Sequence, residues 1–195
     1  MDYCEKLTAD NSVVILVDFL DGFLPGITTI EHDLLRRNAE ALTRLSALFE
    51  MPTVMLGEEG SFRGNFFAQV TAHADHAVRI ERHTPSAWDE PAFRDHIEKT
   101  GCKKIILGGI SLDICTTLLT LDMMGAGYEC YVVVDTCGSD STLNEQAAMM
   151  RMTQAGAVML NWASLASELL KDWENPQGEA VGVLYQTLTR WGNVI

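Results

Sequence analysis

Short apolar runs alternate along the chain with longer stretches of helical periodicity, and this alternation constrains the fold more than any other feature. The run VVILVD at residues 13–18 has the β-branched composition of a buried strand, and residues 31–49 repeat apolar side chains at helical spacing. The pattern predicts strands near 13–18, 53–57, 77–80, 104–109, 129–134 and 157–160, and helices near 31–49, 90–100, 113–125, 142–155, 164–173 and 179–189.

Strands that alternate with helices form parallel sheets, because each connection must cross back to the same end of the sheet. We therefore predict a three-layer α/β/α fold with a doubly wound, six-stranded parallel sheet of the Rossmann-like type. No Pro-, Gly- or Ser-rich linker divides the 195 residues, so we expect a single domain over residues 1–195. The pattern Thr142-x-x-Glu145 predicts a capping box at the start of one helix, which Gly156 would end.

The charge and hydropathy of the chain exclude two classes of partner. A formal net charge of -13 would repel a phosphate backbone, so we expect no nucleic acid partner. The basic pairs Arg36-Arg37 and Lys103-Lys104 are expected at solvated positions. The longest apolar run, residues 13–17, is too short to cross a bilayer, and the first residues lack the pattern of a signal peptide. We expect a cytoplasmic protein without a membrane partner.

The cysteine content favours a reduced compartment over a disulfide framework, because the cysteines are odd in number and none forms a C-x-x-C pair. The pair His73-x-x-His76 has no evident third ligand, so we expect no metal site. The chain contains neither of the glycine-rich phosphate-binding patterns, so we expect no cofactor. The five cysteines are Cys4, Cys102, Cys115, Cys130 and Cys137.

Polar residues stand where the predicted strands end. Asp18 follows the first strand, Glu59 the second, Arg82 the third, Cys115 the fourth and Asp135 the fifth. Ligands of doubly wound sheets bind beyond the carboxyl ends of the strands, where the strand order reverses. We therefore expect a functional site among these residues.

Cys115 is the candidate nucleophile. Ser111 and Asp113 are residue types that cap helices, so the thiol is expected in the first turn of a helix. Unpaired N–H groups there favour a thiolate and can stabilise an oxyanion. The alternative is a buried, inert cysteine. The core-facing stripe of this helix is predicted to be Ile114, Leu118 and Leu121.

Asp18 and Arg82 each admit two interpretations. Asp18 is either a general base that takes the proton of the thiol and delivers it to a leaving amine, or a turn-forming carboxylate. Arg82 is either a cationic partner for the carboxylate and the thiolate, or an ordinary surface arginine.

Three segments resemble the isochorismatase-like cysteine hydrolases, which include nicotinamidases and N-carbamoylsarcosine amidases. They are VVILVDFLDGF at 13–23, RHTPSAW at 82–88, and the run from IILGGISLDICTT to VVVDTCGS at 105–139. The segments SAWDEPAF and MTQAGAVMLNWASLASELLKDWENP are similar to those of the YcaC-like subgroup, whose substrate is unassigned.

The resemblance implies roles for individual residues. Asp18 corresponds to the general base of the family, Cys115 to its nucleophile, and Arg82 to the position of its catalytic lysine. A non-proline cis peptide would join Ile110 to Ser111, and the N–H groups of Ser111 and Cys115 would form the oxyanion hole. Guanidinium and ammonium groups are not interchangeable, so Arg82 is a departure from the family.

The resemblance also bears on cofactor and assembly. The Asp-x-His pattern that nicotinamidases use to bind a metal is absent near residues 56–63, which makes nicotinamide and pyrazinamide poor candidate substrates. YcaC-like proteins form symmetric homo-oligomers, so we expect a homo-oligomer and specifically an octamer.

We therefore expect a hydrolase that acts on a small amide or ureido substrate through a thioester on Cys115. One alternative is an isochorismatase-type vinyl-ether hydrolase, which would depend on Asp18 but not on Cys115. Another is a non-catalytic homo-oligomer that senses oxidants through the same thiol. The residues expected to contact the substrate are Phe19, Glu59, Phe62 and Trp88, with Phe66 as a further aromatic wall.

Overall fold

The computed structural model describes residues 5–193 and contains one six-stranded sheet whose strands are all parallel. The strand order β3-β2-β1-β4-β5-β6 reverses direction between β1 and β4, as in a Rossmann-like fold. The predicted fold class and all six predicted strands are confirmed. The strands are β1 (Ser12–Val17), β2 (Thr53–Leu56), β3 (Val78–Ile80), β4 (Lys104–Gly109), β5 (Glu129–Val133) and β6 (Val158–Leu160).

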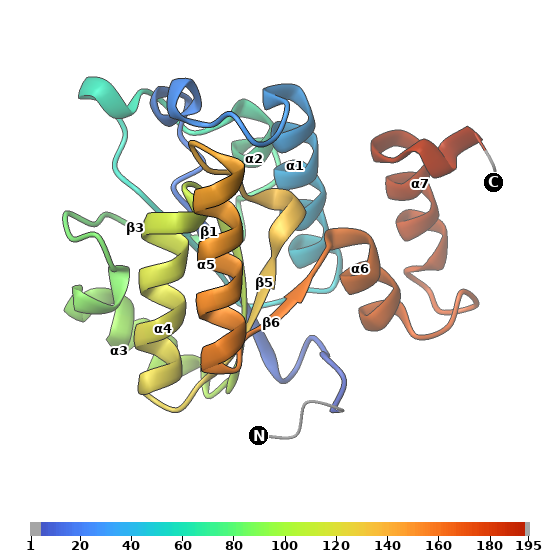
Figure 1. Ribbon diagram of the computed structural model, residues 1–195. Helices are drawn as coiled ribbons and strands as arrows, with labels where there is room; N and C mark the ends of the chain where they lie inside the picture. Colours follow the sequence, from blue (N-terminus) through green and yellow to red (C-terminus); the bar gives the residue numbers. More distant parts are fainter. Residues whose placement is uncertain (1–4, 194–195) are drawn as a thin grey trace.

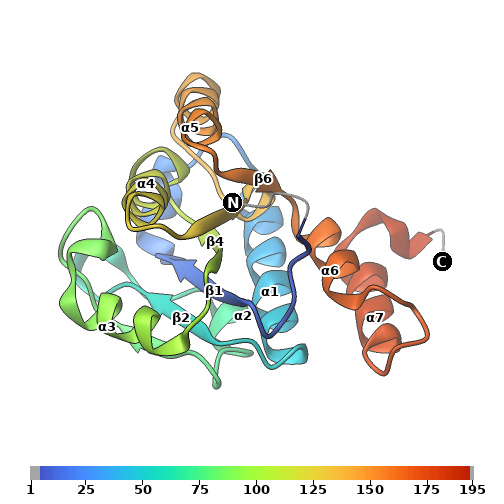
Figure 2. The same cartoon turned by 90° about the horizontal axis from the view of Figure 1, so that it is seen from below.

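Helices cover both faces of the sheet (Figures 1 and 2). One apolar core forms between the sheet and α1, α6 and α7, and a second forms on the opposite face against α3, α4 and α5. Figure 1 shows α7 on the far side of α6 from the sheet. The helices are α1 (His32–Leu48), α2 (Ala68–Thr71), α3 (Pro91–Thr100), α4 (Thr117–Gly125), α5 (Thr142–Ala155), α6 (Trp162–Leu170) and α7 (Gly178–Leu188).

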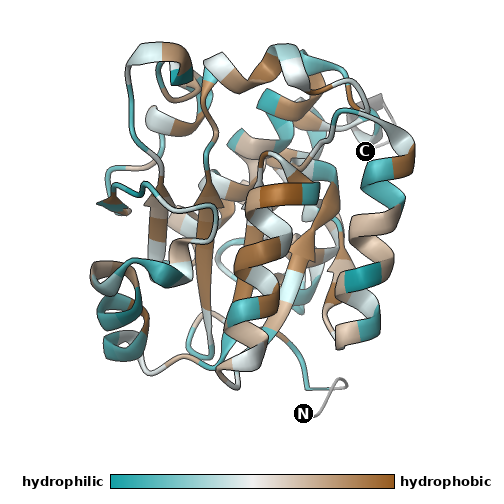
Figure 3. Cartoon of the chain, turned by 60° about the vertical axis from the view of Figure 1, so that its left-hand side comes forward, coloured by the Kyte–Doolittle hydropathy of each residue, from teal (hydrophilic) through white to brown (hydrophobic). Residues whose placement is uncertain are grey.

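The two central strands are buried along their whole length, because helices pack on both faces of each. Figure 3 shows the consequence for their composition: the strands are almost wholly hydrophobic, whereas the helices also carry hydrophilic stretches. Continuous apolar runs therefore marked the strands in the sequence, and amphipathic periodicity marked most of the helices.

The carboxyl ends of β1 and β4 lie so close together that no side chain fits at Gly109, the last residue of β4. Val17 and Gly109 are register partners, and a Cβ on Gly109 would lie 2.1 Å from the carbonyl oxygen of Val17. A Cβ on Gly108 would lie 2.2 Å from Oγ1 of Thr136. Gly109 thus allows the close approach of β1 and β4 where their chains leave the sheet, and Gly108 leaves room for the side chains of Thr136 and Leu42.

Two local predictions are wrong. The N-cap of α5 is Ser141, whose hydroxyl accepts the N–H of Asn144, so Thr142 is the first helical residue and not a cap. Glu145 instead accepts a hydrogen bond from the Thr29 hydroxyl. Lys104 is buried rather than solvated. Its ammonium group pairs with Glu129 at 2.7 Å, so a charge that begins a buried strand is neutralised there.

The core-facing stripe of α4 also differs from the prediction. Ile114 is 53% exposed, and Leu118 and Leu121 are half-buried. Apolar residues surround nearly the whole of this helix, so its periodicity did not identify the buried face. The buried residues of α4 are Thr117, Leu119, Thr120 and Met123.

Asp135, in the loop after β5, connects this loop to α1 and α6 through hydrogen bonds. Oδ1 of Asp135 accepts the N–H of Trp162 at the start of α6, at 3.0 Å. Asn38 of α1 donates to the Asp135 carbonyl and accepts from the Trp162 indole N–H. Burial raises the pKa of Asp135 to about 6, although the hydrogen bond from Trp162 opposes the shift.

Within residues 5–193, none of the helices combines the length and the apolar character needed to cross a membrane.

We expect Gly109→Ala to destabilise the fold strongly. The added methyl group would meet the backbone of Val17, which is fixed in the sheet, so we expect a loss of about 3 kcal/mol or more in the free energy of unfolding. Urea denaturation measures this loss in the free energy of unfolding. The matched control is Gly125→Ala in α4, where a Cβ meets nothing within 4 Å and the change should stay within about 1 kcal/mol. Equal effects of the two substitutions would contradict the close approach of β1 and β4.

The pKa of Asp135 predicts a specific pH dependence of stability. Because this pKa rises on folding from 3.8 to about 6, the folded chain binds the proton more tightly than the unfolded chain. The resulting stabilisation is complete below about pH 4 and is lost as the pH rises through about 6. Asp135→Asn keeps an acceptor for Trp162 and should gain stability relative to wild type, on the order of 2 kcal/mol, between pH 4 and pH 7. Chemical denaturation at the two pH values tests this, and Asp122→Asn on exposed α4 surface should show no such gain.

Candidate active site

The candidate site lies at the carboxyl ends of β1 and β4, where the strand order reverses. Asp18 follows β1 directly, and Cys115 follows the turn that leaves β4. The structure therefore brings together the ends of two strands that are separated by nearly a hundred residues in the sequence, as the switch-point rule predicts.

Asp18 is fixed by its backbone as well as by its side chain. It is 2% exposed, its N–H donates to the Leu56 carbonyl, and its φ of 48° lies in the left-handed region. Gly57, with a φ of 138°, leaves room for the carboxylate, since a Cβ there would lie 3.2 Å from Oδ1 of Asp18. Strained backbone of this kind clusters at functional sites.

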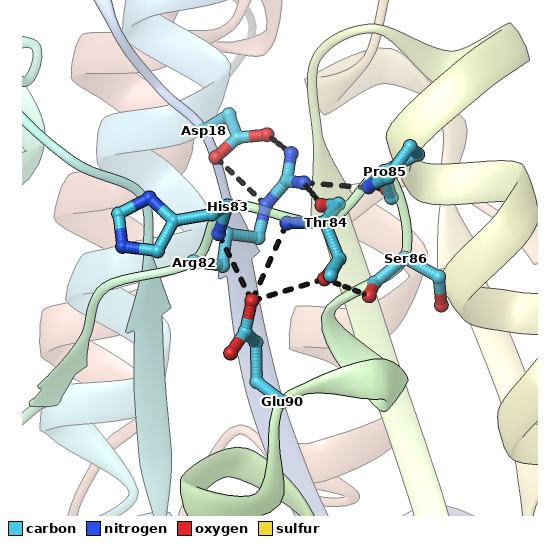
Figure 4. A network of polar contacts seen from close by, with 7 residues as sticks. All are labelled: Asp18, Arg82, His83, Thr84, Pro85, Ser86 and Glu90. Atoms are coloured by element: carbon cyan, nitrogen blue, oxygen red, sulfur yellow. Dashed lines mark hydrogen bonds and ion pairs between the residues drawn. The ribbon is translucent and has the colours of Figure 1, made fainter.

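Arg82 forms a two-point ion pair with Asp18 (Figure 4). Its Nε donates to Oδ1 at 3.2 Å and its Nη2 donates to Oδ2. The two side chains are only 9% and 3% exposed. A fork-like guanidinium matches a carboxylate in this way, whereas an ammonium group acts as a single point charge.

The loop that carries Arg82 is tied to the same guanidinium. Nη1 of Arg82 donates to the carbonyls of Thr84 and Pro85, so all three nitrogens of the group have acceptors (Figure 4). The Glu90 carboxylate accepts the N–H groups of His83 and Thr84 and closes the loop from below. The hydrogen bond from His83 is the main cause that lowers the pKa of Glu90.

Cys115 lies in the first turn of a helix, as predicted, but this turn, Leu112–Thr116, is π-helical and leads directly into α4. The Thr116 N–H reaches back five residues to the Ser111 carbonyl, and the α-helical pattern begins only at Thr117. Single π-turns occur frequently at functional sites. The peptide bond between Ile110 and Ser111 is cis, as the resemblance implied.

Cys115 differs from the other three cysteines of the described chain. It is half-buried and borders two cavities, whereas Cys102, Cys130 and Cys137 are buried. Burial raises the pKa of Cys130 and of Cys137 to about 12. Cys115 is therefore the accessible thiol among these four. Cys4 lies outside the described residues.

Two cavities meet at Cys115, and both also contain Phe23 and Ile114. The first, which we name the Asp18 cavity, has a volume of about 250 Å³. The second, the Asp113 cavity, has a volume of about 240 Å³. The Asp18 cavity is lined further by Asp18, Glu58, Phe62, Arg63, Arg82, His83, Thr84 and Pro85. The Asp113 cavity is lined further by Gly26, Ile27, Ile110, Ser111, Asp113 and Asp140.

The predicted substrate contacts are only partly brought to these cavities. Phe62 lines the Asp18 cavity and is 68% exposed. Phe19 is fully buried against Phe67, Trp88 packs edge-on against Phe93 and Tyr128, and Glu59 accepts the N–H of Phe66. These three side chains line neither cavity. These three side chains pack within the protein or hold loops in place, and they do not form the wall of either cavity.

The residues at the site that sequence reasoning missed come from loops without a strong pattern. Phe23 and Gly26 belong to a 3₁₀ turn, Asp21–Gly26, and Asp140 follows the DTCGS segment. Glu90 had a usable signal, because it precedes Pro91 at the start of a predicted helix and can accept N–H groups there.

No group of three or more His, Cys, Asp or Glu side chains within residues 5–193 is arranged to hold a metal ion. His73 approaches Glu40 at 3.6 Å, and His76 contacts Ser46 and Thr53, so the two histidines face different partners.

Comparison with known proteins assigns the chain to a family. Residues 12–164 match the model of the isochorismatase domain. The chain belongs to the isochorismatase family. This confirms the resemblance found in the sequence, and the family match includes Asp18, Arg82 and Cys115 within its span.

Relatives of known structure within the isochorismatase family share nearly the whole chain. "Probable hydrolase YcaC" of Escherichia coli K12 is 30% identical over 172 residues, which are 87% of this chain and 83% of that protein. The structure of YcaC from Pseudomonas aeruginosa with hexane-2,5-diol and covalent acrylamide is 29% identical, has a TM-score of 0.90, and matches 95% of this chain and 93% of its own. The 1.8 Å structure of the E. coli YcaC gene product, an octameric hydrolase of unknown specificity, is 29% identical, has a TM-score of 0.89, and matches 95% and 91% of the two chains. We therefore identify this chain as a YcaC-like isochorismatase-family hydrolase.

We expect the Asp18–Arg82 pair to be energetically coupled. Arg82→Met leaves a buried carboxylate without its partner, so it should cost about 3 kcal/mol or more in the free energy of unfolding. The double variant Asp18→Asn/Arg82→Met should cost at least about 1 kcal/mol less than the sum of the single variants. Urea denaturation of the four proteins gives the coupling energy. Arg44→Met breaks an ion pair with Glu40 that is more exposed and should cost only about 0.5 kcal/mol; additive effects of the Asp18 and Arg82 variants would show that the pair is not coupled.

Proposed function

We propose that this protein is a cysteine hydrolase that cleaves the C–N bond of a small amide or ureido substrate. The observation that carries the proposal is that Cys115, Asp18 and Arg82 line one cavity at the switch point of the sheet. A nucleophile, a carboxylate that can move protons and a fixed cation are the groups that amide hydrolysis through a thioester requires.

The proposed reaction has two steps, formation of a thioester on Cys115 and its hydrolysis by water. The Cys115 sulfur attacks the amide carbonyl carbon as the thiol proton passes to Asp18. The C–N bond then breaks, Asp18 returns the proton to the leaving nitrogen, and ammonia or an amine departs from a thioester. In the second step water gives a proton to Asp18 and its oxygen to the carbonyl carbon. The C–S bond breaks, the acid is released, and the proton returns to the Cys115 sulfur.

Asp18 can move a proton although Arg82 bonds to both of its oxygens. Each carboxylate oxygen offers two acceptor positions, and the guanidinium occupies one on each oxygen. The guanidinium stays charged at all ordinary pH values, so it holds the carboxylate in place without competing for the proton. We assign Arg82 the place of the family's catalytic lysine, as the cation that holds the Asp18 carboxylate.

Ser111 and Cys115 are proposed to supply the oxyanion hole through their backbone N–H groups. In support, both residues line the Asp113 cavity. Preorganised N–H donors near a developing oxyanion contribute strongly to acyl transfer.

We further propose that the chain acts as a cytoplasmic homo-oligomer, an octamer as E. coli YcaC is. Large apolar side chains exposed on α5, Leu143 at 75% and Met150 at 62%, are compatible with an interface between copies. Light scattering that gives the 21.5 kDa of one chain would contradict the oligomer.

The catalytic proposal predicts that the Cys115 thiol is the most reactive of the described cysteines and that turnover requires it. Acrylamide, which is bound covalently in the P. aeruginosa YcaC structure, should modify Cys115 before Cys102, Cys130 and Cys137, as read by peptide mass spectrometry. In a screen of small primary amides and ureides, Cys115→Ala should lower kcat/KM by at least about a thousandfold, since no covalent route remains. The control Cys102→Ala should retain turnover.

Three results would overturn this proposal. Full turnover in Cys115→Ala together with its loss in Asp18→Asn would favour the vinyl-ether type of hydrolysis. Reversible oxidation of Cys115 by peroxide without turnover of any amide would favour a thiol sensor. An unreactive Cys115 in the folded protein would leave the family assignment without this chemistry.

A further inference from the structure

The Asp113 cavity has a composition unlike that of the Asp18 cavity, although Cys115 belongs to both. Apolar side chains make most of its wall, from Phe23, Ile27, Ile110 and Ile114. A pocket that is mostly apolar with a few polar groups is the ordinary form of a site for a small ligand.

The charged groups around Cys115 leave no cation free for an anionic substrate. Of the two arginines that line the Asp18 cavity, Arg82 bonds to Asp18, and Arg63 pairs with Glu58 at 3.1 Å. His83 also approaches Glu58, at 3.5 Å. No lysine, arginine or histidine of the described chain lines the Asp113 cavity, and two carboxylates, Asp113 and Asp140, do.

One carboxylate oxygen of Asp113 has no hydrogen-bond donor. Its Oδ1 atom is buried and accepts no hydrogen bond from any residue between 5 and 193. A buried carboxylate oxygen without a donor is costly, and no donor of the described chain offsets the charge of this group. Asp113 is two residues before Cys115 in the same π-turn and lines the same cavity, so an uncompensated carboxylate stands beside the nucleophile.

We propose that the Asp113 cavity is the acyl pocket of the enzyme, and that it selects uncharged amides with a short apolar acyl chain. This inference rests on the proposed function, because it assigns the substrate class of that same site. Carboxylate-bearing substrates are excluded by charge, since they would meet Asp113 and Asp140 with no cation to compensate.

The charge selection can be measured with two alkylating reagents of nearly equal size, neutral iodoacetamide and anionic iodoacetate. Peptide mass spectrometry gives the alkylation rate of Cys115 with each reagent. The ratio of the iodoacetamide rate to the iodoacetate rate is then divided by the same ratio for free glutathione. In wild type this quotient should be about 10, because the negative charge of Asp113 repels that of iodoacetate. Asp113→Asn removes the charge without changing the shape and should bring the preference to within about threefold of the reference.

Asp122→Asn is the matched control, because it removes the same charge from an exposed position on α4. It should keep the wild-type preference, which separates the effect of the cavity from that of the net charge. A wild-type preference equal to that of glutathione, or one that Asp113→Asn leaves unchanged, overturns the acyl pocket while the cysteine hydrolase stands. Failure of Cys115 to react with either reagent overturns both proposals.

A second variant tests the place of the pocket without altering any charge. Gly26 lines the Asp113 cavity, and a Cβ there meets nothing within 4 Å, so Gly26→Leu adds a bulky apolar side chain at the cavity wall from a position with open space at its first carbon. We expect the iodoacetamide rate at Cys115 to fall about tenfold, since the amide loses its position beside the thiol. An unchanged rate in a variant of unchanged thermal stability would show that the reagent reaches Cys115 from the Asp18 cavity and would overturn the assignment.

Discussion

The contact between the carboxyl ends of β1 and β4 is the constraint on which the rest of the site depends. Only glycine fits at position 109, because the Val17 carbonyl occupies the space of a side chain. The strands part immediately beyond this contact, one into Asp18 and the other into the π-turn of Cys115. A looser pairing of the two strands would separate the carboxylate from the thiol, so the packing of the sheet and the chemistry of the site share one cause.

Much of this architecture could be predicted from the sequence, for a physical reason. Strands buried on both faces need continuous apolar runs, and most of the helices that cover them need one polar face, so both leave strong periodic signals. The same reasoning failed at α4, which is apolar nearly all round, and at the π-turn, where one extra residue per turn has no compositional mark. Lys104 was misjudged because its partners, Glu129 and Tyr131, lie on a neighbouring strand that the sequence does not place beside it.

The candidate site was predictable where its residues follow strands directly. Asp18, Arg82 and Cys115 stand at strand exits, and the topology then decides that they meet. The walls of the two cavities come from loops and 3₁₀ turns, whose side-chain directions depend on backbone angles that no periodicity encodes. Of these wall residues Phe62 was predicted as an aromatic residue after β2, although it too lies in a 3₁₀ turn, whereas Phe23 and Asp140 were not predicted.

The single guanidinium of Arg82 bonds both to the carboxylate of Asp18 and to the carbonyls of its own loop. A lysine has one nitrogen in place of three and cannot reach all these acceptors from one fixed plane. Exchange of this arginine for lysine would keep the charge beside Asp18 but would leave carbonyls of the Thr84–Pro85 segment without their donor. The hydrogen bonds from the loop to Glu90 would remain, so the identity of residue 82 governs one end of the loop, and the start of α3 governs the other.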